Sequence, residues 1–547
     1  MATRRHIVPA LTVASLLLLA GCAGGSAEGG ETAGGATPSG EPTSGGEAVF
    51  AVDSAFFGFD PNVTPAAQDA RVLRQMFDSL LYLDESGELQ PWLATKWSAS
   101  EDGLSYDFTL RDDVTFWDGT PWNAEALCFN LDRIVDPAAG SIYAIGLVGP
   151  YESCEATAEF SATVTLSSPF TAFLNNLTSP FLGMNSPTAA AAVDPADYLI
   201  KPTGSGPFVF ESYTPQDRIV LTKNEDYAWA PGNAQHAGSA YLDKLTFQII
   251  ADATVRIGSV RSGQVQGIGN VPETEVAALE ADPSMQFIAQ QQSGAPYQLH
   301  FNADRVFADP LVREAARAAL DIDSAVKSLY LGTYERAWSP LSPTTIGYDD
   351  SIEGSFEFDA RQAGELLDEA GWELGSDGVR TKDGETLTVT YMEYTPNREK
   401  RQDLATLFEA NLEAVGFDVD VQFLATAEGQ AMAQNGEYDI AGLSLVAVDP
   451  NVLYQMYDPR FIPTPGQTGF NLSHTDAPEV TELAARSQSA TGDERLEVIS
   501  ELQHEVVDNA RSVGIYVPTY TLALNGLEGV RFDPEGYPIF FDAYLAG

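Results

Sequence analysis

The sequence is short of basic residues. It holds 29 Lys and Arg against 78 Asp and Glu, which gives a formal net charge of −49 over 547 residues. Nucleic-acid binding depends on clustered Lys and Arg that neutralise phosphates, so this balance excludes a nucleic-acid partner. The acidic residues are spread along the chain instead of forming a tail. We interpret them as a well-solvated surface, and attraction of a cationic ligand is the alternative interpretation.

The motifs of common metal and nucleophile sites are also missing. Five His and three Cys supply no His-x-x-x-His pair and no cysteine cluster for zinc. Gly204-Ser205-Gly206 lacks the spacing of a nucleophile elbow, and there is no phosphate-binding Gly-x-x-x-x-Gly-Lys loop. We therefore expect no enzymatic activity, no catalytic residues, no metal and no cofactor. An exported hydrolase stays open as the alternative, because the carboxylates are numerous enough for a glycosidase pair.

Long apolar runs are lacking after residue 20, so no later segment reaches the ~20 residues that a membrane-spanning helix needs. Arg4 and Arg5 precede a mostly apolar stretch over 7–19, which is typical of an export signal. Leu19-Ala20-Gly21-Cys22 then resembles the lipobox of bacterial lipoproteins, whose cysteine is acylated after cleavage. We predict a signal peptide over 1–21 and lipidation of Cys22. A plain secretory signal with an incidental cysteine is the alternative.

Residues 22–46 lack apolar periodicity and consist largely of Gly, Ser, Thr, Pro and Glu. This composition predicts a flexible tether with a root-mean-square span of about 25–30 Å. With a lipid on Cys22, the tether would hold the protein at the outer face of the cytoplasmic membrane, on the extracellular or periplasmic side. The anchor would then be the only membrane contact.

The rest of the chain alternates between strand and helix patterns. Hydrophobic residues make up 44% of the whole sequence, enough for large cores, and the length predicts two or more lobes. Strand-like alternation over 104–122 precedes a helix pattern over 123–135 that Asn123 can cap. Another helix is expected after Asp359, its cap, and before Gly371. This succession predicts mixed α/β lobes.

Cys128 and Cys154 remain as a pair once Cys22 is set aside. An even pair in an exported protein favours a disulfide, here between the helix over 123–135 and the start of the following strand. Two free buried thiols are the alternative interpretation.

Several stretches, in order, resemble the large extracellular solute-binding proteins of ABC importers, the peptide/nickel-binding family known as family 5. LQPWLATKWSASEDGLSYDFTLRDDVTFWDGTPWNAEAL at 89–127 resembles that family's most recognisable segment, and GSGPFVFESYTPQDRIVLTKNEDYAW at 204–229 its glycine turn and strands. Further matching stretches lie at 242–266, 301–323, 359–372 and 436–451. The resemblance covers nearly everything after residue 47.

The resemblance implies an α/β, bilobed periplasmic-binding-protein-like fold of type II, in its large class C form. Two mixed α/β lobes would be joined by a two-strand hinge near Tyr297–Asn302 and Val513–Thr519. Lobe I would comprise 47–297, with an outer subdomain at about 82–190, and lobe II would comprise 298–514. Residues 515–547 would return to lobe I.

The resemblance also implies a function. Such a protein captures a small solute, peptide-like or other, by lobe closure and delivers it to an ABC permease complex made of other chains. We expect a monomer. Relatives with similar segments bind peptides, oligosaccharides, opines or metal chelates, so the solute stays open. A tethered sensor or chaperone that uses the same fold is a further alternative.

Two charged anchors of dipeptide-binding relatives are expected to be missing here. In those relatives an Asp shortly before an Asp-Pro pair holds the ligand ammonium, and counting back from Asp449-Pro450 gives Val446. The position of the Arg that clamps the ligand carboxylate falls at Met392, whereas Tyr394 matches a pocket tyrosine. A buried charge without its partner is costly, so we expect a free dipeptide to bind poorly.

The other candidates form an apolar wall with a few polar groups, as small-ligand clefts do. Asn302 can donate hydrogen bonds to a ligand and Glu393 can serve a cation, while a plain core strand is the alternative for the apolar run at 443–448. The candidate ligand-binding residues are Ser54, Phe56, Phe57, Asn302, Glu393, Tyr394, Leu443, Leu445, Val446 and Val448.

Overall fold

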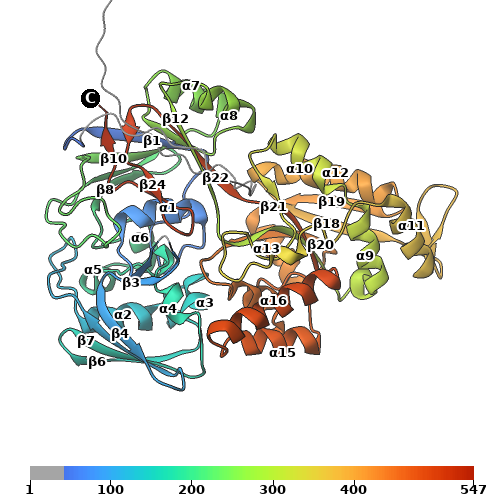
Figure 1. Ribbon diagram of the computed structural model, residues 1–547, viewed down its shortest axis with the longest axis horizontal. Coiled ribbons are helices and arrows are strands. Elements are labelled where there is room, and N and C mark those ends of the chain that lie inside the picture. The colour runs from blue at the N-terminus through green and yellow to red at the C-terminus, as the bar shows by residue number, and fades with distance from the viewer. Residues whose placement is uncertain (1–41, 85, 547) are drawn as a thin grey trace, which may run out of the picture. The chain divides into compact units, whose positions relative to one another are not determined.

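The alternation of apolar and polar residues builds two large β-sheets, each with its own buried core. Figure 1 shows the computed structural model, which describes residues 42–84 and 86–546. The predicted signal peptide (1–21), Cys22 and most of the predicted tether lie outside the described residues. The compact unit Pro38–Gly547 contains every element that follows.

The first sheet begins with the strand at the start of the folded body. Its order is β12-β22-β11-β1-β10-β9-β8, with β1 parallel to β10 and β11 and all other pairs antiparallel. Phe50 and Phe247 of this sheet pack against Phe540, so the C-terminal residues return to it. The strands are β1 (Glu47–Val52), β8 (Phe208–Thr214), β9 (Arg218–Lys223), β10 (Lys244–Ile249), β11 (Gly267–Gly269), β12 (Gln286–Gln291) and β22 (Thr519–Leu524).

The second sheet has the order β14-β21-β13-β20-β18-β19. β18 is parallel to β19 and β20, and the other pairs are antiparallel. Strand β13 is buried along its whole length, and its apolar and aromatic residues are interrupted only by the buried polar residues Gln298 and His300. The strands are β13 (Gly294–Phe301), β14 (Glu335–Arg336), β18 (Thr388–Tyr394), β19 (Asp418–Leu424), β20 (Ile440–Val446) and β21 (Ser512–Val517).

An antiparallel four-stranded sheet, β4-β5-β7-β6, lies within the expected outer subdomain. Its strands are β4 (Ala94–Ala99), β5 (Ser105–Leu110), β6 (Tyr151–Ala158) and β7 (Ser161–Leu166). The smaller sheets use β2 (Leu81–Leu83), β3 (Leu89–Pro91), β15 (Glu373–Leu374), β16 (Arg380–Lys382), β17 (Glu385–Thr386), β23 (Leu527–Glu528), β24 (Arg531–Phe532), β25 (Pro538–Ile539) and β26 (Tyr544–Leu545).

Two of the helices begin at the capping residues that the sequence predicts. The side chain of Asn123 accepts a hydrogen bond from the Ala126 amide, and that of Asp359 from the Gln362 amide, which confirms both predicted caps. None of the helices in the described ranges combines the length and apolarity that crossing a membrane requires. The helices are α1 (Ala67–Met76), α2 (Ala124–Val135), α3 (Ala144–Val148), α4 (Phe173–Asn176), α5 (Pro187–Ala192), α6 (Pro195–Ile200), α7 (Ala253–Arg261), α8 (Glu273–Glu280), α9 (Pro310–Ala319), α10 (Ile322–Tyr330), α11 (Ala360–Glu369), α12 (Arg401–Glu413), α13 (Thr426–Asn435), α14 (Val452–Tyr457), α15 (Pro478–Ser487) and α16 (Gly492–Asp508).

The chain passes between the two large sheets at two places. It leaves β12 for β13 through Gln292 and Ser293, and it returns from β21 to β22 through Pro518 (Figure 1). The Gln292 amide donates to the Pro518 carbonyl at 2.8 Å, so the two passages lie side by side. The expected hinge segment Val513–Thr519 contains Pro518, whereas the expected segment Tyr297–Asn302 covers the later part of β13 and the residue after it. The expected lobe boundaries at 297/298 and 514/515 lie within β13 and β21. We call 42–291 with 519–546 the first half and 294–517 the second half.

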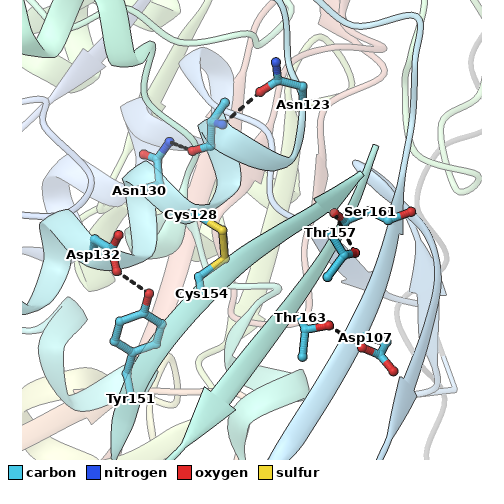
Figure 2. The surroundings of a disulfide bond; sticks show 11 residues. Asp107, Asn123, Cys128, Asn130, Asp132, Tyr151, Cys154, Thr157, Ser161 and Thr163 are labelled. Atoms are coloured by element: carbon cyan, nitrogen blue, oxygen red, sulfur yellow. Dashed lines mark hydrogen bonds between the residues drawn. A yellow bond between two sulfur atoms is a disulfide. The ribbon is translucent and has the colours of Figure 1, made fainter. Parts of the chain in front are cut away.

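The expected disulfide between Cys128 and Cys154 is present. It joins α2 to β6, with the two Cα atoms 5.1 Å apart (Figure 2). The bridge therefore ties the helix of the outer subdomain to the edge strand of its four-stranded sheet.

Candidate functional site

A cavity of about 230 Å³ lies where the two halves meet. The first half contributes the start of α1, Tyr143, Phe181 and Tyr537, and the second half contributes β20, Tyr394 and Arg398. Gln430, Gln434, Ser444 and Thr468 add polar groups to a mostly apolar and aromatic wall. Small-ligand sites have this composition.

This cavity continues into a second cavity of about 760 Å³. Ile142, Tyr143, Thr468, Gly469 and Phe470 line both of them. The second cavity lies between residues from 141–170 of the first half and residues from 451–489 of the second half. We call the two cavities together the cleft.

The cleft differs in charge from the rest of this acidic protein. Among the described residues, no Asp or Glu lines either cavity, although the sequence holds 78 of them. The charged residues in the lining are Arg398, which donates to Glu399 at 3.0 Å, and Arg460, which donates to Asp458 at 2.9 Å. The described part of the chain also brings no three metal-ligating side chains together. The cleft is therefore poorly suited to a cation.

Four predicted residues meet at this cavity. Leu443, Leu445 and Val446 line it from β20, and Tyr394 lines it from the end of β18. The Val446 carbonyl accepts a hydrogen bond from the Tyr143 hydroxyl of the first half at 2.7 Å. The strand at 440–446 thus forms part of the second sheet and one wall of the cleft at once.

The other predicted residues lie elsewhere. Asn302 is fully buried. Its side-chain NH2 donates to the Tyr438 carbonyl at 2.9 Å, and its side-chain carbonyl accepts from the backbone amide of Asp304, so Asn302 stabilises a turn. Phe56 packs in the first core beside Phe59, and Phe57 is 52% exposed. Ser54 donates to Asp53 at 3.1 Å.

Met392 and Val448 occupy separate environments. Met392, the expected carboxylate-clamp position, is fully buried in a small core next to Ala441. Val448 lines two further cavities, of about 50 and about 530 Å³, beside Pro534.

Glu393 lies in a buried polar cluster behind the cavity wall. Its carboxylate accepts hydrogen bonds from the Tyr297 hydroxyl and the Tyr394 amide. Burial raises the pKa of Glu393, and the charge of Arg401 opposes that rise. Arg401 donates to Ser444 at 2.8 Å, so the cluster reaches the cavity through the Ser444 hydroxyl. Glu393 therefore acts on the cavity only through intervening groups.

Glu399 pairs with both arginines of this cluster, Arg398 and Arg401. It accepts from Arg401 at 2.7 Å and from the Tyr516 hydroxyl at 2.6 Å. Burial works to raise the pKa of Glu399, but the charges of Arg398 and Arg401 together hold it well below its usual range. Glu399 is therefore ionised, and its negative charge offsets one of the two positive charges of Arg398 and Arg401.

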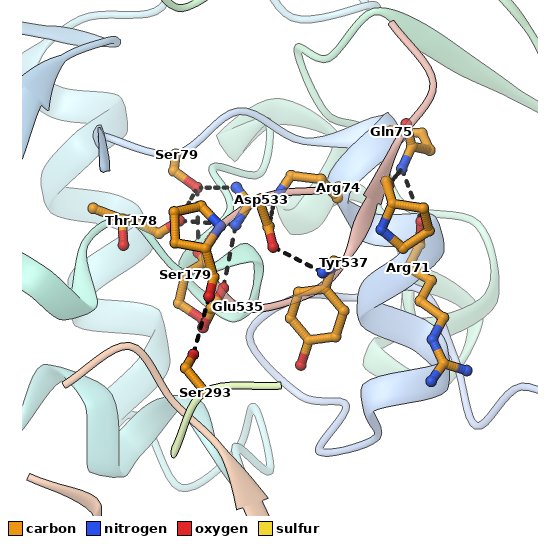
Figure 3. A network of polar contacts seen from close by, with 12 residues as sticks. Arg71, Arg74, Gln75, Ser79, Thr178, Ser179, Ser293, Asp533, Glu535 and Tyr537 are labelled. Carbon is orange, nitrogen blue, oxygen red and sulfur yellow. Dashed lines mark hydrogen bonds and ion pairs between the residues drawn. The ribbon is translucent and has the colours of Figure 1, made fainter. Parts of the chain in front are cut away.

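A second polar network supports the opposite wall. Figure 3 shows Arg74 of α1 reaching Asp533 and Glu535, two carboxylates close to the C-terminus. Arg74 also donates to Ser79 and to the Thr178 carbonyl, and Ser179 donates to Glu535. The network fixes the chain that leads into Tyr537, which lines the cavity.

Direct contacts join the two halves around the cleft. Asn175 donates to Asp449 at 2.8 Å, and Asp449 is also held by Arg495 of α16 through two donors. Thr171 donates to the Gln488 carbonyl at 3.0 Å, and Lys400 pairs with Glu273 at 2.8 Å. The structure therefore represents a closed arrangement, in which the two halves contact each other directly.

Several lining residues were not predicted. Arg398 belongs to the stretch TYMEYTPNR, in which Tyr394 was predicted as a pocket residue. The sequence therefore pointed to this stretch, although not to Arg398 itself. Tyr143, Phe181 and Tyr537 are separated by long stretches of chain and carry no local pattern that distinguishes them from core aromatics.

Comparison with known protein families gives one extended match. The model of the family described as "Bacterial extracellular solute-binding proteins, family 5 Middle" matches residues 88–461. The glutathione-binding protein GsiB of Escherichia coli (strain K12) is 30% identical over 329 residues, which are 60% of this chain and 62% of GsiB. The match to these curated relatives thus spans less than two thirds of their length.

Solved structures with the same arrangement match nearly the whole chain. The periplasmic binding protein DppA from Helicobacter pylori, in complex with the peptide STSA, is 26% identical with a TM-score of 0.78, covering 92% of this chain and 99% of that one. The oligopeptide-binding protein AppA from Bacillus subtilis, in complex with a nonapeptide, is 22% identical with a TM-score of 0.79, covering 93% and 100%. GsiB, DppA and AppA are all named as binding proteins.

Proposed function

The chain belongs to the bacterial extracellular solute-binding proteins of family 5 and has their bilobed α/β fold, and from this premise we propose that it captures a solute between its lobes for an ABC importer. The importer's permease complex would be made of other chains. The observation that supports this most is the cleft, whose walls come from both halves while only two strands of chain connect them. Ligand contacts to both walls favour the closed arrangement over the open one.

We assign the lobes from the sheet topology. Lobe I would be 47–291 with 519–547, lobe II would be 294–517, and Gln292, Ser293 and Pro518 would form the hinge. A hinge needs only a few residues that absorb the change in φ and ψ.

We propose a peptide-like solute of more than two residues. GsiB is named for glutathione, and the DppA and AppA structures hold a tetrapeptide and a nonapeptide. The cleft consists of two adjoining cavities, which supports a ligand longer than a dipeptide, and its lining without carboxylates argues against a free dipeptide ammonium as the main anchor. Other small solutes of similar length remain within the same proposal.

We propose that the chain binds its solute without converting it. A hydrolase of the glycosidase type needs two carboxylates facing the substrate, and none of the carboxylates in the described ranges lines the cleft. A tethered sensor or chaperone would share the fold, but it would not need an importer.

We also propose that a lipid on Cys22 anchors the monomer at the outer face of the cytoplasmic membrane. Exchange of Cys22 for Ser in the full chain should move the protein from the membrane fraction to the soluble fraction, as seen by immunoblot. Retention of the Cys22→Ser variant in the membrane fraction after an alkaline wash would refute the anchor.

Native mass spectrometry and thermal unfolding of the purified protein with tri- to pentapeptides test the binding function. A ligand at a hundredfold excess over its Kd should stabilise the protein by about 2.7 kcal/mol without being consumed. Steady consumption of the peptide would show an enzyme instead.

A further inference from the structure

The two cavities of the cleft meet at a junction whose walls come from both halves. The residues that line both cavities surround this junction. The first half contributes two of them in sequence, and the second half contributes a run of three. We call these residues the neck: Ile142, Tyr143, Thr468, Gly469 and Phe470.

Tyr143 holds the first-half side of the neck in place. Its ring lies edge-on against Phe181, with the ring centroids 4.9 Å apart. Its hydroxyl donates to the Val446 carbonyl of β20 at 2.7 Å, so Tyr143 reaches across the cleft to the second half. A ligand group could displace Tyr143 only by breaking this hydrogen bond and this ring contact.

The second-half side of the neck belongs to a loop that is closed on itself. The backbone groups of Thr464 and Gln467 bond to each other at 3.1 and 2.8 Å, and the Asn471 amide donates to the Phe461 carbonyl at 3.0 Å. A Cβ atom at Gly469 would lie 2.0 Å from the same carbonyl oxygen, so the two arms of the loop are in direct contact. The loop therefore cannot move aside without losing these contacts.

Phe470 fills the space between the halves at this point. It is partly buried and packs against the core of each half. Ile142 adds apolar bulk from the first half. A side chain forced into such a packed apolar contact must displace its neighbours, which is unfavourable. The neck therefore suits the main chain of a peptide better than a large side chain.

We propose that the neck makes the protein selective for peptides that carry a small residue, Gly or Ala, at one interior position, where the peptide passes from one cavity into the other. This inference rests on the proposed function, because a peptide of more than two residues would extend through both cavities. The side chains on either side of the small residue would enter the cavities, whose volumes are about 230 and about 760 Å³. Ile142 and Phe470 are then the specificity-determining residues.

The test is a substitution series in the ligand. Native mass spectrometry selects the strongest-binding member of a pool of tri- to pentapeptides, and calorimetry then measures versions of that peptide with Ala or Leu at each position in turn. Comparing Ala with Leu avoids the extra backbone freedom of Gly. At one interior position we expect the Leu version to bind wild type roughly 10- to 100-fold more weakly than the Ala version. At the other positions Leu should bind as well as Ala or better.

Variants of the protein connect this difference to the neck. Ile142→Ala and Phe470→Ala should each remove most of the difference by raising the affinity for the Leu version. Each comparison is a ratio of two affinities measured on one variant, so a lower stability of Phe470→Ala does not alter it. Ile142 is 36% exposed, so Ile142→Ala leaves the cores intact and provides the test even if Phe470→Ala fails to fold.

Ile200→Ala and Phe210→Ala are the matched controls. Ile200 is 44% exposed at the end of α6, Phe210 is half-buried in β8, and neither residue lines the cleft. Both controls should keep the wild-type difference between the Ala and Leu versions.

The remaining outcomes overturn the inference. If Leu is accepted as well as Ala at every interior position, or if the difference persists in Ile142→Ala and in any folded Phe470→Ala, the neck does not select, and the proposed function stands. If no peptide of the pool binds, the inference also fails, and protein purified from its own host decides on the proposed function. A solute carried by that protein supports the proposed function, and protein that carries none contradicts both.

Discussion

At the scale of single residues, the network around Arg74 contains more acidic groups than basic ones. One guanidinium faces two buried carboxylates, Asp533 and Glu535, at 2.8 and 3.3 Å. Burial, followed by the charge of Asp533, raises the pKa of Glu535 to about 8. Glu535 is therefore protonated near neutral pH, and the network holds Arg74 with one carboxylate charge.

This protonation makes the stability of the fold depend on pH. Unfolded Glu535 titrates near its ordinary pKa of 4.5, and folded Glu535 near 8, so the folded state holds the extra proton in between. The contribution of Glu535 to the free energy of unfolding is complete below pH 4.5 and falls by up to about 1.4 kcal/mol per pH unit as pH rises toward 8. Glu535→Gln should remove this loss, so its urea-unfolding free energy should decline less than that of wild type between pH 5 and 8.

Glu497→Gln provides the control, because Glu497 is an exposed residue of α16. Its unfolding free energy should follow the wild-type curve at every pH. Parallel curves for Glu535→Gln and wild type would mean that Glu535 is ionised in the folded protein.

The sequence predicted part of the cleft at this scale. The sequence allowed Leu443, Leu445 and Val446 to be predicted, because an apolar strand of this kind must lie in a core or form the wall of a cavity. Asn302 does not line the cleft. A polar residue after a strand can serve a turn as well as a ligand, and here the side-chain NH2 and the side-chain carbonyl of Asn302 both bond to backbone groups.

At the scale of elements, the caps and the bridge were predictable and the crossings were less so. Asn123 and Asp359 mark helix starts by local hydrogen bonding, which sequence alone specifies. The crossing at Pro518 lies between two strands that are both fully buried, and the crossing at Gln292–Ser293 lies between half-buried β12 and fully buried β13. Hydrophobic periodicity does not say to which of two sheets such a strand belongs.

The bridge between α2 and β6 should stabilise the outer subdomain. Cys128 and Cys154 are 26 residues apart, and closing a loop of that length contributes about 3–4 kcal/mol in the chain-entropy model. The double variant Cys128→Ser, Cys154→Ser should therefore unfold at lower temperature in calorimetry.

Wild type treated with a reductant should show the same lower unfolding temperature as the double variant. Equal stability of oxidised wild type and the double variant would show that α2 and β6 hold together without the bridge. Alkylation followed by mass spectrometry establishes which form is measured.

At the scale of the whole molecule, the lobes are held together by few polar contacts. Asn175 reaches Asp449 across the cleft, and Asp449 keeps its two bonds to Arg495 whether or not Asn175 is present. Thr171 likewise reaches the Gln488 carbonyl from the outer subdomain. These contacts stabilise closure without belonging to either lobe's core, so they can be removed without unfolding a lobe.

Asn175→Ala should shift the ligand-free protein toward the open arrangement. A hydrogen bond to a charged carboxylate contributes about 1.5 kcal/mol, so the ratio of closed to open molecules should fall by roughly tenfold. If ligand-free wild type is mostly open, the peptide affinity of the variant should fall by nearly that factor. If ligand-free wild type is mostly closed, the affinity should change little, and the radius of gyration of the ligand-free variant, measured by X-ray scattering, should be larger than that of wild type. Saturating peptide should return both proteins to the same radius of gyration.

The free energy of unfolding in urea should fall by no more than the stability that the closed arrangement contributes, because Arg495 still bonds to Asp449 in the variant. An unchanged radius together with an unchanged affinity would mean that the cleft is held closed by its apolar walls alone, and that the solute need not drive the lobes together.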